Sequence, residues 1–192
     1  MFSLQLSKVF ASHLLRPLAL LAVAAAAAPG AALANSPWAG GGSMGIVDES
    51  CYLAVQMDNS EVRLAPGLLF PCKLRYQVTD SFGTLSTATL AMFANIRDTS
   101  ATAGKVAVRQ YEYPINGTAP AGNLMATIDS DALVGTPIAA TGFTRYRFPA
   151  SCAGAMSLNF TNNSYWIEVD MTPGLLPVLP GLALGSLQLR NC

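Results

Sequence analysis

Hydrophobic and polar residues alternate along most of the chain after residue 45, the period of a half-buried β-strand. The clearest run is 165–171, where Glu168 and Asp170 alternate with large apolar residues. Glu168 and Asp170 are therefore expected to face solvent while their neighbours face a core. The same pattern predicts strands over residues 51–57, 73–79, 85–96, 105–113, 143–148, 165–171 and 184–190.

Turn-forming residues separate these predicted strands. Gly, Pro, Asn and Asp gather at 80–83, 116–117, 162–164 and 172–174, and Asn116-Gly117 is typical of a tight hairpin turn. Residues 86–103 are rich enough in alanine to tolerate a helix as well as a strand. Short strands with frequent turns predict an all-β fold, a single antiparallel β-sandwich or jelly-roll-like domain.

The first 34 residues have the pattern of a cleaved signal peptide. Lys8 and Arg16 give a positive start, residues 18–28 are an unbroken apolar run, and Ala32-Leu33-Ala34 offers the small residues of a cleavage site. The apolar run is short for a membrane span of about 20 residues. We therefore expect export, to a periplasm, a cell surface or the medium, with no integral membrane segment in the mature chain. The alanine-rich leader is typical of bacteria.

Cleavage after residue 34 sets the expected domain organisation. Residues 35–45 are rich in glycine and predict a flexible lead-in. The β-sandwich domain is expected over residues 46–192.

Four cysteines follow the leader, an even number in a compartment where thiols oxidise. Two disulfides are expected, and three pairings are possible. We favour Cys51 with Cys72 and Cys152 with Cys192, since each bond then closes a loop of a few tens of residues.

Charge is sparse and nearly balanced. Eleven Lys and Arg residues face eleven Asp and Glu residues, and charged residues make up 11% of the chain. Loss of Lys8 and Arg16 with the leader leaves a slightly acidic mature chain. Nucleic acids and anionic membranes attract clustered basic residues, so neither is an expected partner.

The sequence contains few residues that could form a catalytic site together. The chain has one histidine, His13, which leaves with the leader. Ser43 lies in a Gly-x-Ser-x-Gly motif, but without a histidine and a strand-to-helix turn the motif is read as part of the linker. The remaining hydrolase hypothesis uses a carboxylate pair drawn from Glu112, Glu168 and Asp170. The cysteine spacing and the missing histidine also argue against a metal site, and no cofactor is expected.

Two acidic turns and one pair of arginines each allow a functional and a structural interpretation. The acidic turns at 129–131 and 58–61 carry calcium-type oxygens but too few for a site, so they are read as turn caps. Arg145 and Arg147 flank Tyr146, and arginine beside aromatic residues can bind a sugar, a peptide or a nucleic acid. A nucleic acid is not expected because basic residues are few, and a cross-strand ion pair with Glu168 or Asp170 is the favoured interpretation.

The segment 172–185 is more apolar than a surface loop requires. It either folds over the end of the core or is exposed as a docking loop for another subunit or a membrane surface. The residues of this possible interaction loop are Leu175, Leu176, Val178, Leu179 and Leu182.

The sequence therefore favours a secreted, non-catalytic β-sandwich that is a binding module or a subunit of a surface assembly. Protein, carbohydrate or a second copy of the chain are the expected partners. The alternatives are a secreted hydrolase that uses carboxylates, and a disulfide-linked inhibitor or effector that acts on another protein.

Overall fold

The structure is a computed structural model that describes residues 38–80, 83–98, 104–117, 122–174 and 181–192. The chain divides into two compact units, Met1–Asn35 and Ser36–Cys192, and every described residue belongs to the second. The predicted signal peptide, residues 1–34, lies outside the described residues. In the part of the chain that the structure describes, no helix is long and apolar enough to cross a membrane.

The described residues form strands and three short 3₁₀ helices. The helices are η1 (Gly42–Met44), η2 (Glu49–Cys51) and η3 (Cys152–Gly154). The strands are β1 (Trp38–Gly41), β2 (Ile46–Val47), β3 (Val55–Asp58), β4 (Glu61–Leu64), β5 (Cys72–Val78), β6 (Thr89–Arg97), β7 (Lys105–Pro114), β8 (Asn123–Asp129), β9 (Thr136–Pro137), β10 (Thr144–Phe148), β11 (Met156–Ser157), β12 (Asn163–Thr172) and β13 (Ala183–Asn191).

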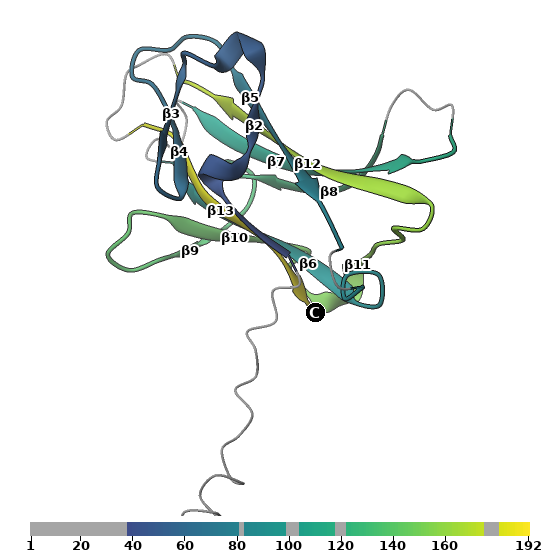
Figure 1. Ribbon diagram of the computed structural model, residues 1–192. Coiled ribbons are helices and arrows are strands. Elements are labelled where there is room, and N and C mark those ends of the chain that lie inside the picture. Colours follow the sequence, from purple (N-terminus) through teal and green to yellow (C-terminus); the bar gives the residue numbers. More distant parts are fainter. Residues whose placement is uncertain (1–37, 81–82, 99–103, 118–121, 175–180) are drawn as a thin grey trace, which may run out of the picture. The chain divides into compact units, whose positions relative to one another are not determined.

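The strands form two antiparallel sheets. The eight-stranded sheet has the order β3-β4-β13-β6-β10-β9, with β1 added to β13 and β11 to β6. The five-stranded sheet has the order β2-β5-β12-β7-β8. The two sheets lie as two layers (Figure 1). The predicted all-β fold, an antiparallel β-sandwich, is confirmed.

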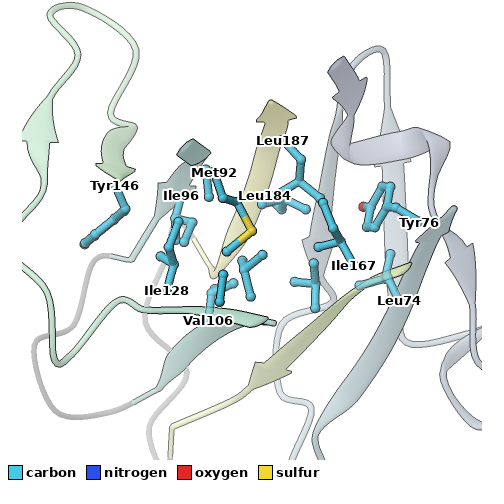
Figure 2. Close-up of a cluster of buried hydrophobic side chains, with 14 of the residues drawn as sticks. Leu74, Tyr76, Met92, Ile96, Val106, Ile128, Tyr146, Ile167, Leu184 and Leu187 are labelled. Carbon is cyan, nitrogen blue, oxygen red and sulfur yellow. The ribbon is translucent and has the colours of Figure 1, made fainter. Parts of the chain in front are cut away.

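The core between the sheets is built by alternate side chains of the central strands. In β12, Tyr165, Ile167, Val169 and Met171 are all buried, as the alternation predicted. Figure 2 shows side chains from both sheets gathered in one cluster, among them Ile167. Each large side chain contributes roughly 1.5–3 kcal/mol by leaving water, so this layer dominates the stability of the domain.

Some strand predictions need correction. The region 86–103, which tolerated a helix, contributes the strand β6. The predicted strand at 51–57 is shorter, because Cys51 ends η2 and β3 begins at Val55. The sequence pattern missed β8. A bulge opposite Gln110 and Tyr111 breaks the alternation there, so apolar residues stand next to one another along the strand.

The predicted flexible lead-in at 35–45 is wrong for its described residues. β1 pairs with β13 in register from Trp38 to Gly41, and η1 follows directly. The glycines here permit close packing: a Cβ on Gly42 would lie 2.0 Å from the Leu184 carbonyl oxygen. The Tyr76 hydroxyl also donates a hydrogen bond to the Gly42 carbonyl. The ordered domain thus begins well before residue 46.

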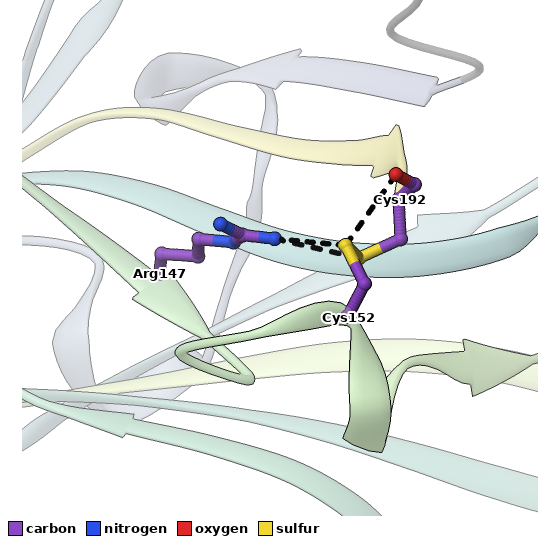
Figure 3. Close-up of a disulfide and its surroundings, with 3 residues drawn as sticks. All are labelled: Arg147, Cys152 and Cys192. Carbon is purple, nitrogen blue, oxygen red and sulfur yellow. Dashed lines mark hydrogen bonds between the residues drawn. A yellow bond between two sulfur atoms is a disulfide. The ribbon is translucent and has the colours of Figure 1, made fainter.

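A disulfide joins Cys152 to Cys192, one of the two expected bonds. It ties η3 to the residue that follows β13, so the end of the last strand is fixed to the loop after β10 (Figure 3). The Arg147 guanidinium lies beside both sulfur atoms, 3.2 Å from Cys152 Sγ and 3.4 Å from Cys192 Sγ.

The other two cysteines are buried neighbours. Cys51 and Cys72 are each 1% exposed and are free thiols in this structure. Burial, and then a hydrogen bond with Cys51, raises the pKa of the Cys72 thiol to about 12. The bond between them stays a prediction, and their proximity supports it.

Candidate ligand-binding face of the five-stranded sheet

The outer face of the five-stranded sheet follows from the register of its three central strands. Residues paired across antiparallel strands project to the same side of the sheet. Trp166 of β12 pairs with Gln77 of β5 and Tyr111 of β7. Since Tyr165 and Ile167 on either side of Trp166 are buried in the core, Trp166 must point outward.

Three aromatic side chains lie together on this face. Trp166 faces Tyr111 across the strand pair, and Tyr113 follows two residues along β7. The rings of Tyr111 and Tyr113 are 6.2 Å apart at their centroids and tilted by 45°. All three side chains are partly exposed. Because they project from hydrogen-bonded central strands, their positions are set by the sheet rather than by loops.

Charged side chains lie beside the aromatic group on the same face of the sheet, at Glu168 and Asp170 of β12 and at their neighbours on the adjacent strands. Glu168 lies 3.0 Å from the Lys73 ammonium and 3.2 Å from Arg75 Nε. Asp170 forms an ion pair with Arg109. The hydrogen bond from Lys73 to Glu168 raises the pKa of Lys73, so this cation stays charged at neutral pH. The network fixes Arg75 and Glu168 next to Trp166 and carries one more cation than carboxylates, since Lys73, Arg75 and Arg109 share Glu168 and Asp170.

A hollow of about 320 Å³ opens over this part of the sheet. Its lining residues are Arg75, Tyr113, Trp166 and Glu168. The indole N–H of Trp166 and the two terminal nitrogens of Arg75 have no hydrogen-bond partner among the described residues. The hollow therefore combines flat apolar surface with donors and a carboxylate acceptor.

The structure separates Glu112 from the other two carboxylates of the hydrolase hypothesis. Glu112 pairs with the buried Tyr165 and so points to the inner side of the sheet, where its Oε1 accepts hydrogen bonds of 2.8 Å from Tyr165 and Asn163. Glu168 and Asp170 lie on the outer face, and both are ion-paired. Glu168 and Asp170 stay close together, 3.0 and 3.9 Å from Lys73 Nζ, and Glu168 also lines the open hollow. A hydrolase that uses this pair stays a prediction.

The other motifs of the sequence have structural partners. Ser43 Oγ donates to the Asn59 carbonyl at 2.6 Å and lies in η1, not at a strand-to-helix turn. In the acidic turns, Asp129 binds Lys105 and Asp58 binds Arg63. Across the described residues, no group of three or more metal-ligating side chains is found.

The expected ion pair between Arg145 or Arg147 and the carboxylates of β12 is wrong. β10 lies in the eight-stranded sheet and pairs with β6, whereas β12 lies in the other layer. Arg145 instead donates to Asn95 Oδ1 at 3.3 Å, and Arg147 lies over the Phe93 ring at 5.6 Å.

Of the residues of the possible interaction loop, Leu182 lies in the part of the chain that the structure describes. Leu182 is 7% exposed and its carbonyl accepts a hydrogen bond from the Leu64 N–H, so it belongs to the core and not to an exposed docking surface. Leu175, Leu176, Val178 and Leu179 lie outside the described residues, and a docking role for them stays a prediction.

Sequence reasoning missed the central residue of this face. Trp166 follows the same period of two as Glu168 and Asp170, which were placed outward. The signal was therefore present, as an aromatic residue on the solvent side of an otherwise regular strand. What the sequence could not supply was the identity of the neighbouring strands, and with it the approach of Tyr111 and Arg75.

Comparisons with known proteins identify no family for this chain. No protein-family model matches it, and no curated protein matches it. Among solved structures, the chain is similar to a non-crystalline cellulose specific carbohydrate-binding module, with a TM-score of 0.34 and 13% sequence identity over 71% of this chain and 77% of that chain. At this TM-score the similarity is too small to indicate a function.

Proposed function

We propose that this protein is a secreted, non-catalytic module that binds carbohydrate on the outer face of its five-stranded sheet. The observation that carries the proposal is the position of Trp166, which lies with Tyr113, Arg75 and Glu168 around one open hollow. Export rests on the pattern of residues 1–34. Binding of a protein partner or of a second copy stays a prediction.

The chemistry of the hollow matches the two surfaces of a sugar ring. The faces of a pyranose carry C–H groups that pack on flat aromatic side chains, while its edges carry hydroxyl groups that both donate and accept hydrogen bonds. Trp166 and Tyr113 offer the first kind of surface. Arg75 and Glu168 offer donors and an acceptor for the second, held in place by their mutual ion pair.

The rigidity of the site also favours binding. Its side chains come from β5, β7 and β12, which are the central strands of the sheet. A ligand that meets preformed groups loses less free energy to ordering them. Glu168 and Asp170 each form an ion pair with an arginine of a neighbouring strand. These pairs hold the carboxylates in place, which suits a role in binding.

Replacing Trp166 tests the proposal. Native affinity gels that contain hydroxyethylcellulose, xylan, galactomannan or a β-1,3-glucan should show retardation of the mature protein by at least one of these polysaccharides. Because Trp166 supplies flat apolar surface for the ligand, Trp166→Ala should weaken binding roughly tenfold or more, which is about 1.4 kcal/mol. Circular dichroism should show an unchanged fold, because Trp166 is not part of the core.

Phe93→Ala is the matched control. Phe93 is a partly exposed aromatic residue in β6, a central strand of the opposite sheet. It should leave the retardation unchanged. Retardation that is lost in Phe93→Ala and kept in Trp166→Ala would place the ligand on the eight-stranded sheet, and no retardation by any polysaccharide would contradict carbohydrate binding itself.

A further inference from the structure

A second hollow adjoins the proposed binding site. It measures about 380 Å³ and is lined by Ile46, Val47, Asp48, Glu49 and Arg75. Arg75 also lines the hollow at Trp166, so this one side chain borders both. The two hollows therefore meet at a shared wall.

The register shows how the second hollow continues the first across the strands. Ile46 of β2 pairs with Arg75 of β5, which in turn pairs with Glu168 of β12. The three residues form one outward row on neighbouring strands. Adjacent strands lie about 4.8 Å apart, so the row from β2 to β12 extends roughly 10 Å along the surface.

The groups in the second hollow offer the same kinds of contact as the first. Ile46 is 63% exposed although it is a large apolar residue, and it provides surface for a ring face. The Glu49 carboxylate has no hydrogen-bond partner among the described residues and is exposed. Asp48 accepts from Ser50 N and Oγ, which lowers its pKa, so at neutral pH it is a charged acceptor held at a fixed position.

Arg75 connects the two groups of contacts. Its Nε is bound to Glu168, which orients the guanidinium, and its side chain is 52% exposed. Among the described residues the terminal nitrogens form no hydrogen bond or salt bridge, and the positive charge of Arg75 helps to lower the pKa of the nearby Asp48. A hydroxyl-bearing chain that lies over Arg75 can thus receive hydrogen bonds from the middle of the surface while its two sides occupy the hollows.

We propose that the ligand is a glycan chain of several units that crosses the strands from Trp166 over Arg75 to a second subsite at Ile46 and Glu49. This inference rests on the proposed carbohydrate binding and adds the length and direction of the ligand. A single terminal sugar would fill one hollow and leave the other without a ligand.

Titration calorimetry with oligosaccharides of two to six units tests the inference. They are cut from whichever polysaccharide retards the protein in affinity gels. The affinity of the unchanged protein should rise at least tenfold between the shortest and the longest chain. Ile46→Ala with Glu49→Gln should remove most of that rise and leave the affinity for the shortest chain within about twofold.

Asp131→Asn is the matched control, because Asp131 is an exposed carboxylate in the turn after β8. It should keep the full dependence on length. An affinity that is the same for all lengths, or a rise that persists in the double variant, would overturn the second subsite and leave the proposed function intact. Absence of binding to any polysaccharide would instead overturn both proposals.

Discussion

At the scale of single residues, Gln110 stands out because it is a fully buried polar side chain in the described part of the core. Neither its Nε2 nor its Oε1 has a hydrogen-bond partner among the described residues. It projects from β7 at the bulge that β8 forms opposite Gln110 and Tyr111. A buried amide without partners has lost its bonds to water and gained none in return.

Replacing this amide by an apolar side chain of similar size should stabilise the protein. An unsatisfied buried polar group costs about 1–3 kcal/mol, so Gln110→Leu should raise the free energy of unfolding by roughly that amount. Guanidinium denaturation measures the change as a higher midpoint with an unchanged slope.

Gln56→Leu provides the comparison, because Gln56 is exposed on β3. It should change the free energy of unfolding by no more than about 0.5 kcal/mol. A lower stability for Gln110→Leu would show that the amide has a partner, such as a buried water molecule, and would contradict the prediction.

Two glycines show why composition alone mispredicted the start of the domain. Gly42 and Gly45 come from a segment whose composition predicted flexibility. At Gly42 a side chain would strike the Leu184 carbonyl, and at Gly45 it would lie 2.5 Å from the Tyr76 ring. Composition shows that the Cβ is missing but not which neighbour occupies its space, so the sequence could not distinguish a linker from a closely packed segment around η1.

At the scale of elements, β12 contributes to both the core and the proposed binding face. Its buried residues and its outward residues alternate without interruption from Ser164 to Thr172. This regularity is why the sequence predicted the strand correctly. One strand thus links the stability of the sandwich to the geometry of Trp166 and Glu168.

The contact between η2 and β5 leads to a prediction about the second disulfide. Cys51 ends η2 and Cys72 begins β5, and the Cys51 thiol donates a hydrogen bond to the carbonyl of Pro71, the residue before Cys72. In an oxidising compartment, a disulfide-bearing oxidant should accept the two electrons of this pair while two protons are released. By loop-closure entropy the bond should contribute about 3 kcal/mol.

A variant without the first disulfide isolates the second. In the protein with Cys152→Ser and Cys192→Ser, exported and then denatured without reductant, thiol titration should detect no free thiol. Two free thiols per chain would show that Cys51 and Cys72 remain reduced. The Cys51→Ser, Cys72→Ser protein should unfold at lower denaturant concentration than the unchanged protein.

At the scale of the whole molecule, strands that are distant in sequence form the layers. β5 and β7 lie on either side of β12, and β6 lies between β10 and β13. Such pairings are long-range, so no local pattern specifies them. They decide that Arg75 and Glu168 lie beside Trp166, and that Arg145 and Arg147 belong to the other sheet.

Export is also a property of the whole molecule. If the leader is cleaved as expected, the exported protein should begin at one defined residue. When the full chain is expressed in a bacterium, mass spectrometry of the exported protein should give the mass of the chain that begins at Asn35. Ala34→Asp removes the small residue before the expected cut and should leave the leader attached. An exported product that retains residues 1–34 in the unchanged protein would contradict the predicted cleavage.

The sequence by itself determined the features that depend on local periodicity. The alternation in β5, β7, β10, β12 and β13 defined the fold class and the buried residues of these strands, since a pleated strand turns successive side chains to opposite faces. The cysteine positions likewise indicated Cys152 with Cys192. Only the tertiary structure decided which strands are neighbours, and therefore that Trp166, Tyr113, Arg75 and Glu168 share one hollow. Alternation fixes which way a side chain points, whereas its neighbours across the sheet depend on strand pairings between distant parts of the chain.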